Sequence, residues 1–400
     1  MKISLVILMH LIFQSCIFSE PPQGSKPDNP GQILTGADQT ENYLPLIKHQ
    51  NIAIVANQTS QIGGVHLVDT LLSLGVNIKK VFGPEHGFRG NAADGQLVSD
   101  SVDKKTGLPI VSLYGKHKKP THEDLVEIDL VIFDIQDVGA RFYTYISTMS
   151  YMMEACAENG VEMIVLDRPN PHGDNVDGPV LEKEFSSFVG LHEIPVVHGM
   201  TVGEYAQMVN GEGWLKDGIK CDITIIPCKS YNHKSRYELP VAPSPNLPNN
   251  IAIQLYPSLC FFEGSIISVG RGTEFPFQVI GHPDFGIGSF VFTPEPVPGV
   301  SNHPLYEGEA CYGQSLEGFA LNVLPKDRRL HLNWLIDYYS YFKDKEPFFT
   351  NYFEKLAGTD KLREQIEAGL TETQIRESWQ EGINAFKEIR KKYLLYPDFE

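Results

Sequence analysis

Cysteine is scarce in this sequence, since only six of its 400 residues are cysteines. Five of them lie beyond residue 150, at wide spacings and without a CxxC pair. A disulfide framework or a zinc knuckle needs paired cysteines at short, regular spacings, so neither is indicated. We expect these five residues to be buried free thiols.

Positive charge is also in short supply, because 33 Lys and Arg face 50 Asp and Glu and leave a net charge of −17. Such a chain lacks the basic surface with which proteins wrap nucleic acid or bind anionic lipid, so we expect no nucleic-acid partner. A hydrophobic content of 42% with 21% charged residues is ordinary for a globular protein. The length exceeds what one core usually supports, which favours two domains.

Several catalytic and cofactor motifs are missing. No GxGxxG follows the first expected strand and no GxxxxGK[ST] occurs, so the loops that cradle phosphates are lacking. No GxSxG elbow supports an α/β-hydrolase triad. His192, Glu193 and His198 do not form HExxH, and the residues between them prevent the helix that would align two zinc ligands. These motifs therefore indicate neither a nucleotide cofactor nor a zinc site, and we expect no metal.

The first 40 residues are typical of an exported protein. Lys2 precedes an apolar run of about 11 residues, which is typical of a secretory signal and too short to span a bilayer. Ser15 and Cys16 end this run as in a bacterial lipoprotein signal, so residues 1–16 are interpreted as a signal peptide with Cys16 as the lipidated residue. Plain secretion is the alternative. Residues 17–40 are interpreted as a flexible tether. The expected location is the periplasm, as a free protein or as a membrane-anchored lipoprotein.

Short apolar runs alternate with amphipathic stretches over residues 41–235. Runs of this kind predict parallel strands covered by helices on both faces, which is a Rossmann-like, doubly wound α/β domain. Residues 236–400 contain many turns and then charged helical periodicity, which predicts a smaller α+β domain that ends in helices. The expected strands are 52–56, 78–82, 110–113, 130–135, 162–166 and 223–226, and the expected helices are 65–74, 122–127, 143–159 and 202–209.

Polar residues follow four of the expected strands. The carboxyl ends of parallel strands meet at one edge, where doubly wound sheets bind their ligands, so a polar ligand site is predicted there. Within it, Glu85 lies in a loop framed by Gly and Pro, which suits a general acid. Asp137 has a competing role as a helix cap, and Thr201 with Glu204 forms a capping box. The polar residues of this edge are Asn57, Glu85, His86, Arg89, Asp134, Asp137, Arg141, Asp167, Arg168 and Asn170.

A second polar cluster lies in the C-terminal part. Glu263, Arg271 and Glu274 stand among glycines that let the backbone approach a ligand closely. An arginine in such a loop can hold a carboxylate through two parallel hydrogen bonds.

The sequence resembles one known family in five segments, and the likeness runs from about residue 45 to the C-terminus. That family is DUF1343, the NamZ exo-β-N-acetylmuramidases, which are glycoside hydrolases. The resemblance implies removal of N-acetylmuramic acid from the non-reducing end of peptidoglycan fragments, without a cofactor, in a cleft between a Rossmann-like and a C-terminal domain. It places the family's catalytic glutamate at Glu85. The segments are 83–90 (GPEHGFRG), 134–145 (DIQDVGARFYTY), 166–171 (LDRPNP), 243–248 (PSPNLP) and 263–273, which begins with EG and ends with GRGT.

Muramic acid carries a lactyl carboxylate, and an acidic protein must concentrate positive charge locally to bind it. Arg89, Arg141, Arg168 and Arg271 are the candidates. The second catalytic group stays open among Asp134, Asp137 and Glu263, and so does the choice between retention, inversion and participation of the 2-acetamido group. The remaining predicted substrate-binding residues are Asn57, His86, Tyr143, Asp167, Asn170, His198, Asn246 and Glu274.

Two other functions compete with the muramidase. The first is a non-catalytic envelope lipoprotein that binds peptidoglycan fragments without cutting them. The second is an esterase or amidase acting on the cell wall, for which no nucleophile motif is present.

Overall fold

The computed structural model describes residues 31–90 and 101–400. The expected signal peptide and Cys16 therefore lie outside the described residues. The main compact unit comprises Ile33–Glu400. Among the described residues, no helix combines the length and the apolar character needed to cross a membrane.

The expected tether ends earlier than residue 40, because residues from 33 onward are packed into the fold. Leu34 and Lys229 exchange backbone hydrogen bonds of 3.1 and 2.9 Å. Gly36 lies so close to Asp167 and Ile226 that a side chain at this position would overlap their backbone atoms. Residues 33–40 therefore belong to the α/β domain.

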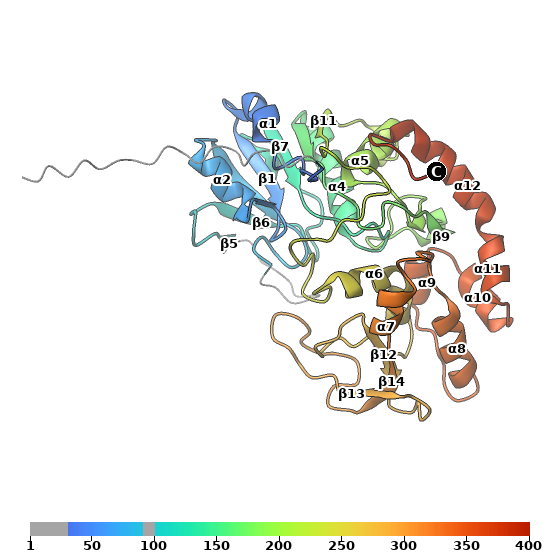
Figure 1. The fold of residues 1–400 in the computed structure, drawn as a ribbon. Helices are drawn as coiled ribbons and strands as arrows, with labels where there is room; N and C mark the ends of the chain where they lie inside the picture. Colours follow the sequence, from blue (N-terminus) through green and yellow to red (C-terminus); the bar gives the residue numbers. More distant parts are fainter. Residues whose placement is uncertain (1–30, 91–100) are drawn as a thin grey trace, which may run out of the picture. The chain divides into compact units, whose positions relative to one another are not determined.

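The N-terminal part is built on a large, mostly parallel sheet (Figure 1). Only β5 pairs antiparallel, at the edge beside β6. Strand β1 lies at the point where the order reverses, between β4 and β7, as in doubly wound folds. In spatial order the seven described strands are β11 (Ile223–Ile226), β8 (Glu162–Leu166), β7 (Leu130–Asp134), β1 (Ile52–Ala56), β4 (Ile78–Gly83), β6 (Pro109–Ser112) and β5 (Ser101–Val102).

Alternate side chains of the central strands enter two separate hydrophobic cores, one on each face of the sheet. Ala53 and Val55 of β1 belong to the core that contains α4 (Tyr145–Asn159) and α5 (Val202–Gly211). Ile52 and Ile54 belong to the core that contains α1 (Thr40–Ile47) and α2 (Leu67–Ser73). Because both faces are covered, the strands are apolar throughout, which is why they are recognisable in the sequence.

The predicted doubly wound α/β domain is confirmed, and its expected strands and helices lie within a few residues of their predicted bounds. The expected helix at 65–74 differs most, because Val65 and His66 pair with Gln61 and Ile62 before α2 begins. His66 caps α2 by accepting a hydrogen bond from the Val68 amide. The shorter elements of this part are β2 (Gln61–Ile62), β3 (Val65–His66), α3 (His122–Leu125), β9 (Asp177–Val180) and β10 (Pro195–Val197).

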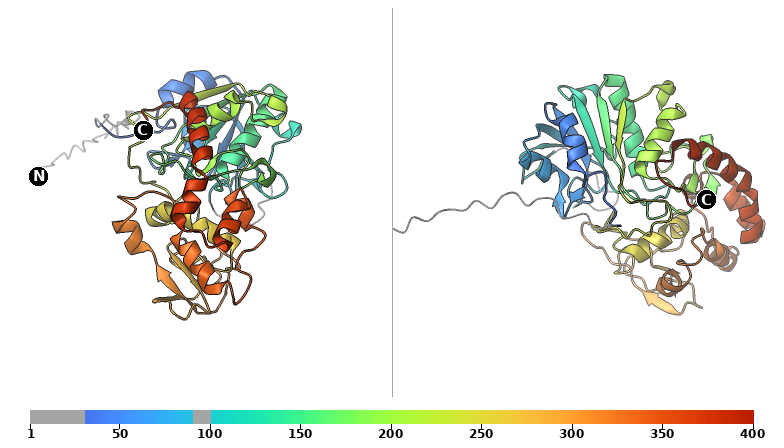
Figure 2. Two further views of the ribbon diagram at one scale, coloured as in Figure 1. Left: turned by 90° about the vertical axis from the view of Figure 1, so that its right-hand side faces the viewer. Right: turned by 45° about the horizontal axis from the view of Figure 1, so that its top comes forward.

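The C-terminal part is α+β, as expected. It contains a small antiparallel sheet in the order β12-β14-β13, flanked by helices. Its last helix returns to the N-terminal part, where it contacts β9 and β10 (Figure 2). The elements are α6 (Asn250–Leu259), β12 (Val279–His282), β13 (Phe290–Phe292), β14 (Cys311–Ser315), α7 (Glu317–Asn322), α8 (Asn333–Phe342), α9 (Phe353–Ala357), α10 (Lys361–Glu367), α11 (Glu372–Ser378) and α12 (Gln380–Arg390).

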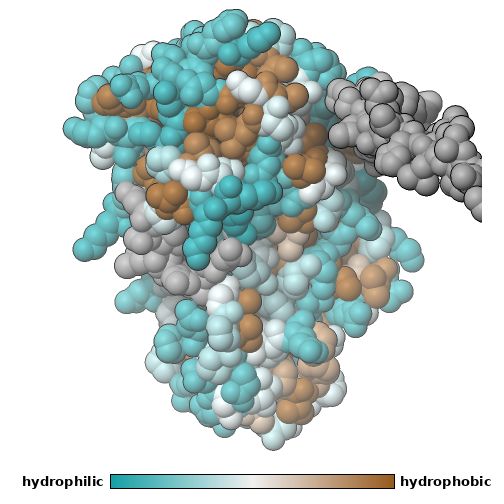
Figure 3. Space-filling model, turned by 90° about the vertical axis from the view of Figure 1, so that its left-hand side faces the viewer, coloured by the Kyte–Doolittle hydropathy of each residue, from teal (hydrophilic) through white to brown (hydrophobic). Residues whose placement is uncertain are grey.

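The five cysteines beyond residue 150 are buried free thiols, as predicted. On the face of the molecule shown in Figure 3, hydrophilic side chains predominate and apolar ones form separate groups among them.

Candidate functional site

One cavity lies where segments from both parts of the chain meet. The volume open to the centres of water-sized molecules is about 50 Å³, and the cavity adjoins open solvent at its mouth. The N-terminal part contributes the loop after β4 and the residues that lead into α4, and the C-terminal part contributes α6 and two loops. The lining residues are Glu85, His86, Phe142, Tyr143, Thr144, Tyr145, Ser244, Asn246, Leu247, Tyr256, Arg271 and Phe277.

Glu85 reaches the cavity from a tight turn at the carboxyl end of β4. The amide of Gly87 donates to the carbonyl of Pro84 at 2.9 Å, and His86 adopts a positive φ of 68°. The turn directs the half-buried carboxyl of Glu85 toward the start of α4. There the Thr144 hydroxyl donates to Glu85 Oε2 at 3.2 Å. The turn and this hydrogen bond together hold one carboxyl group at the cavity wall.

Asp137 follows the end of β7 and is almost completely buried. Its Oδ2 accepts a hydrogen bond of 2.6 Å from the Gly139 amide. Gly139 has a φ of 78°, and a Cβ there would overlap the side chain of Asn170, so the position requires glycine. Oδ1 of Asp137 has no hydrogen-bond partner among the described residues. A buried carboxylate oxygen without a partner is costly, which points to a ligand that donates to it.

Asn246 presents a second unsatisfied acceptor from the C-terminal part. Its Nδ2 donates to the Val300 carbonyl at 3.1 Å, while Oδ1 is buried without a partner in the described chain. The Tyr145 hydroxyl donates to the Pro243 carbonyl at 3.2 Å and faces the side chains of Tyr143 and Asn57. A ligand in this cavity therefore meets hydroxyls and acceptors, which suits a sugar.

Arg271 lies on the opposite side of the cavity, in a loop whose flanking glycines have φ values of 77° and 81°. Its Nε donates to Glu263 Oε1 at 2.7 Å, and its guanidinium lies 5.1 Å from the centre of the Phe277 ring. The thiol of Cys260 donates to the other oxygen of Glu263 at 3.5 Å. Glu263 therefore orients Arg271, which lines the cavity, by accepting a hydrogen bond from its Nε.

Three of the four arginines predicted to bind the lactyl group do not line the cavity. Arg89 pairs with Asp103 at 2.7 Å and with Asp69 at 3.3 Å. Arg141 is completely buried and donates to four backbone carbonyls, and this burial lowers its pKa to about 9. Arg168 forms two hydrogen bonds with the fully buried Asp134. We drop these arginines from the candidate site. The carbonyl partners of Arg141 belong to Pro179, Ile194, Leu356 and Ala357.

Four further predicted residues leave the candidate site for similar reasons. Both oxygens of Asp134 are engaged by Arg168, and burial raises the pKa of this carboxyl despite that partner. Asp167 accepts from Thr201, Gly203 and Tyr396, and burial raises its pKa to about 6. The amide of Asn170 bridges His172 and Met200. Glu274 is exposed and does not line the cavity.

Glu204 is a helix-capping residue, as predicted. Its Oε2 accepts from the Thr201 amide at 2.9 Å, and the Thr201 hydroxyl in turn accepts from the Glu204 amide.

The structure adds lining residues that sequence reasoning missed. Thr144 and Tyr145 lie inside the segment 134–145 but carry no recognisable catalytic pattern, and Ser244 lies inside the segment 243–248. Tyr256 reads as an ordinary core aromatic, and its ring is buried. Only the packing of the two parts of the chain brings this ring to the cavity.

Comparisons with known proteins agree on one family. The N-terminal model of the exo-β-N-acetylmuramidase NamZ matches residues 52–251, and the C-terminal model matches residues 254–396. The family models thus divide the chain later than the expected boundary at 235/236. The peptidoglycan β-N-acetylmuramidase NamZ of Bacillus subtilis (strain 168) is 38% identical over 401 aligned residues, which cover 93% of this chain and 95% of that protein.

Solved structures from Bacteroides fragilis NCTC 9343 match as well. One DUF1343 family protein is 46% identical with a TM-score of 0.85, and a second is 28% identical with a TM-score of 0.77. In both cases the match covers 92% of this chain and 99% of the other.

Taken with these matches, the two-part fold and the cavity that Glu85 lines are those of a glycoside hydrolase. The chain belongs to the NamZ family of exo-β-N-acetylmuramidases, also known as DUF1343, as the resemblance predicted.

Proposed function

We propose that this chain hydrolyses the glycosidic bond of terminal, non-reducing N-acetylmuramic acid in peptidoglycan fragments, with Glu85 as the general acid. The observation that carries the proposal is the cavity in which Glu85 faces groups from the C-terminal part. The named activity of the Bacillus subtilis relative supports the same substrate.

Glu85 acts on the leaving group. As the bond between C1 of muramic acid and the bridging oxygen breaks, the electron pair stays on that oxygen and Glu85 gives it a proton. The Thr144 hydroxyl holds the carboxyl group at the cavity wall through its bond to Oε2. Water later supplies the hydroxyl at C1 and returns a proton, so the enzyme is regenerated.

Asp137 is the second carboxylate in this proposal. Asp134 forms an ion pair with Arg168, and Glu263 forms one with Arg271. Asp137 is the remaining one of the three candidates. Asp137 does not itself line the cavity, but Tyr143 does, and Tyr143 lies close to both Asp137 and Glu85. Oδ1 of Asp137 is a buried carboxylate oxygen without a partner among the described residues.

Arg271 is proposed to recognise the lactyl carboxylate. It is the arginine among the four candidates that lines the cavity, and Glu263 engages it at Nε. The guanidinium group is planar and carries paired N–H donors, which is the geometry that binds a carboxylate bidentately. Glucosamine lacks the lactyl group, so this contact would distinguish muramic acid from it.

The proposed activity is tested by chromophore release from para-nitrophenyl β-N-acetylmuramide, beside the matching N-acetylglucosaminide. We expect turnover of the muramide and none, or far less, of the glucosaminide. A folded protein that cleaves neither substrate and does not cleave a MurNAc–GlcNAc disaccharide would contradict the proposal. Binding of the uncut disaccharide would then favour a non-catalytic envelope protein.

For localisation, we propose export and lipid anchoring at Cys16, on the basis of the apolar run and the Ser15–Cys16 end in the sequence. Cells expressing the chain and fed labelled palmitate are expected to incorporate label into the wild type and none into Cys16→Ser. The matched control is Cys311→Ser, which removes a buried thiol and keeps the label. An unlabelled wild type recovered in the soluble periplasmic fraction would favour plain secretion.

A further inference from the structure

His198 lies beside the proposed second carboxylate, in a buried position just after β10. Its ring is 1% exposed. Nδ1 accepts a hydrogen bond of 3.3 Å from the Met200 amide, so the proton of the neutral ring is on Nε2. Nε2 lies 3.7 Å from Asp137 Oδ2. The backbone thus selects the tautomer that directs an N–H group at Asp137.

The loop that carries His198 is clamped by the end of the chain. Arg390, which is completely buried, donates to the Gly199 carbonyl through Nε at 3.1 Å and Nη2 at 2.8 Å. Asp398 holds the same guanidinium through both of its oxygens, at 2.7 and 2.8 Å. Gly199 has a φ of 61°, and a side chain there would overlap the Asn175 carbonyl. Gly199, the residue after His198, is therefore held by Arg390 through its carbonyl and packs against the Asn175 carbonyl.

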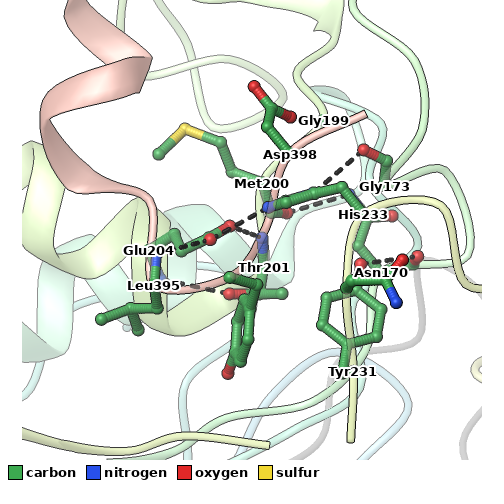
Figure 4. A network of polar contacts seen from close by, with 12 residues as sticks. Asn170, Gly173, Gly199, Met200, Thr201, Glu204, Tyr231, His233, Leu395 and Asp398 are labelled. Atoms are coloured by element: carbon green, nitrogen blue, oxygen red, sulfur yellow. Dashed lines mark hydrogen bonds and ion pairs between the residues drawn. The ribbon is translucent and has the colours of Figure 1, made fainter. Parts of the chain in front are cut away.

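A second buried network holds the chain end against the same loop (Figure 4). Glu204 Oε1 accepts from the Leu395 amide at 2.9 Å and lies 3.0 Å from His233 Nε2. His233 Nδ1 lies 3.0 Å from the Gly173 carbonyl, and its amide donates to the Pro397 carbonyl. Residues 390–398 thus form a strap, here called the C-terminal strap, over the loop at 198–201.

We infer that His198 is a positioning residue for Asp137, and that the clamp of Arg390 and Asp398 on Gly199 keeps its N–H group directed at that carboxylate. The inference rests on the proposed function, in which Asp137 acts on the sugar. Hydrogen bonds of catalytic groups are often long without substrate and tighten in the complex, so the 3.7 Å contact is expected to shorten when the sugar binds.

Three tyrosines surround Asp137 besides His198. Tyr143, Tyr145 and Tyr205 face the carboxylate, and Glu85 faces the first two of these tyrosines. His198 is distinguished from them by an Nε2 that the backbone directs at Oδ2 from 3.7 Å. His172 faces His198, and burial lowers the pKa of His172 to about 3, so it is neutral. A donor directed at a carboxylate favours the charged form of that carboxylate, so removal of the His198 N–H group is expected to alter the acidic side of the pH–activity profile.

The experiment compares His198→Leu with His198→Gln, whose amide can donate from a similar place. In His198→Leu we expect kcat on the aryl muramide to fall about 10- to 100-fold with little change in KM. The acidic limb of its kcat/KM profile should move to higher pH. His198→Gln should recover most of both effects. The control is His331→Leu, a buried histidine of the C-terminal part that should lower the melting temperature without moving the pH profile.

The strap is tested by Arg390→Met against Arg390→Lys. The methionine variant should reproduce the lower kcat and the shifted acidic limb, while lysine can still donate to the Gly199 carbonyl and should behave closer to the wild type. An active wild type with unshifted profiles in His198→Leu and Arg390→Met would overturn the inference and leave the proposed function standing. A wild type inactive on muramides would overturn the proposed function, and the inference with it.

Discussion

Glu85→Gln is expected to lower kcat on a MurNAc–GlcNAc disaccharide by about 10²- to 10⁴-fold, because the amide keeps the shape of the side chain but has no proton to give. The loss should be much smaller on para-nitrophenyl muramide, since nitrophenolate leaves without protonation. Steady-state kinetics on both substrates, with a melting curve for each variant, measure this difference. A substrate-dependent loss identifies an acid, whereas a uniform loss indicates damage to binding.

The matched control is Glu162→Gln. Glu162 begins β8, so it lies at the amino ends of the strands, whereas Glu85 lies at their carboxyl ends. Glu162 is exposed, so this variant should keep the activity of the wild type on both substrates. Equal losses on the two substrates in Glu85→Gln would count against the general-acid role. If Glu85→Gln kept the activity of the wild type, the general acid would have to be another residue of the cavity.

Arg271→Met is expected to remove most of the preference for muramides over glucosaminides. A hydrogen bond to a charged group contributes about 1.5–3 kcal/mol, so kcat/KM on the muramide should fall roughly 10- to 100-fold, chiefly through KM. Activity on the glucosaminide, which carries no lactyl carboxylate, should change little. Arg271→Lys should keep part of the preference, because it retains the charge but not the planar pair of donors.

Arg89→Met is the control for this prediction. Arg89 is also an arginine with carboxylate partners, but it pairs with Asp69 and Asp103 and does not line the cavity. Loss of the Arg89 side chain should leave the ratio of kcat/KM on the muramide to kcat/KM on the glucosaminide unchanged. If Arg89→Met altered that ratio and Arg271→Met did not, the lactyl group would be bound elsewhere than at Arg271.

The site was only partly predictable, and the reason is visible in single residues. Glu85 could be singled out because the glycine and proline around it are local features of the chain. Arg141 looked equally suitable for a ligand, yet two of its carbonyl partners, Leu356 and Ala357, lie more than 200 positions further along the chain. The residues next to Arg141 in the chain give no sign that these carbonyls will lie beside it in the fold. His198 was included as a polar residue, but the clamp by Arg390 that fixes its loop could not be foreseen.

The sequence by itself determined the positions of the strands, the doubly wound domain, the capping box at Thr201 and the family. These properties depend on residues close together in the chain: apolar runs that must be buried on both faces, turn formers, and uninterrupted segments of family sequence. Only the tertiary structure decided which polar side chains remain available to a ligand. A buried charge must find partners, and packing supplies them from distant segments, as the carbonyls of Leu356 and Ala357 do for Arg141. The side chains that line the cavity, Glu85 among them, then determine what the site can do chemically.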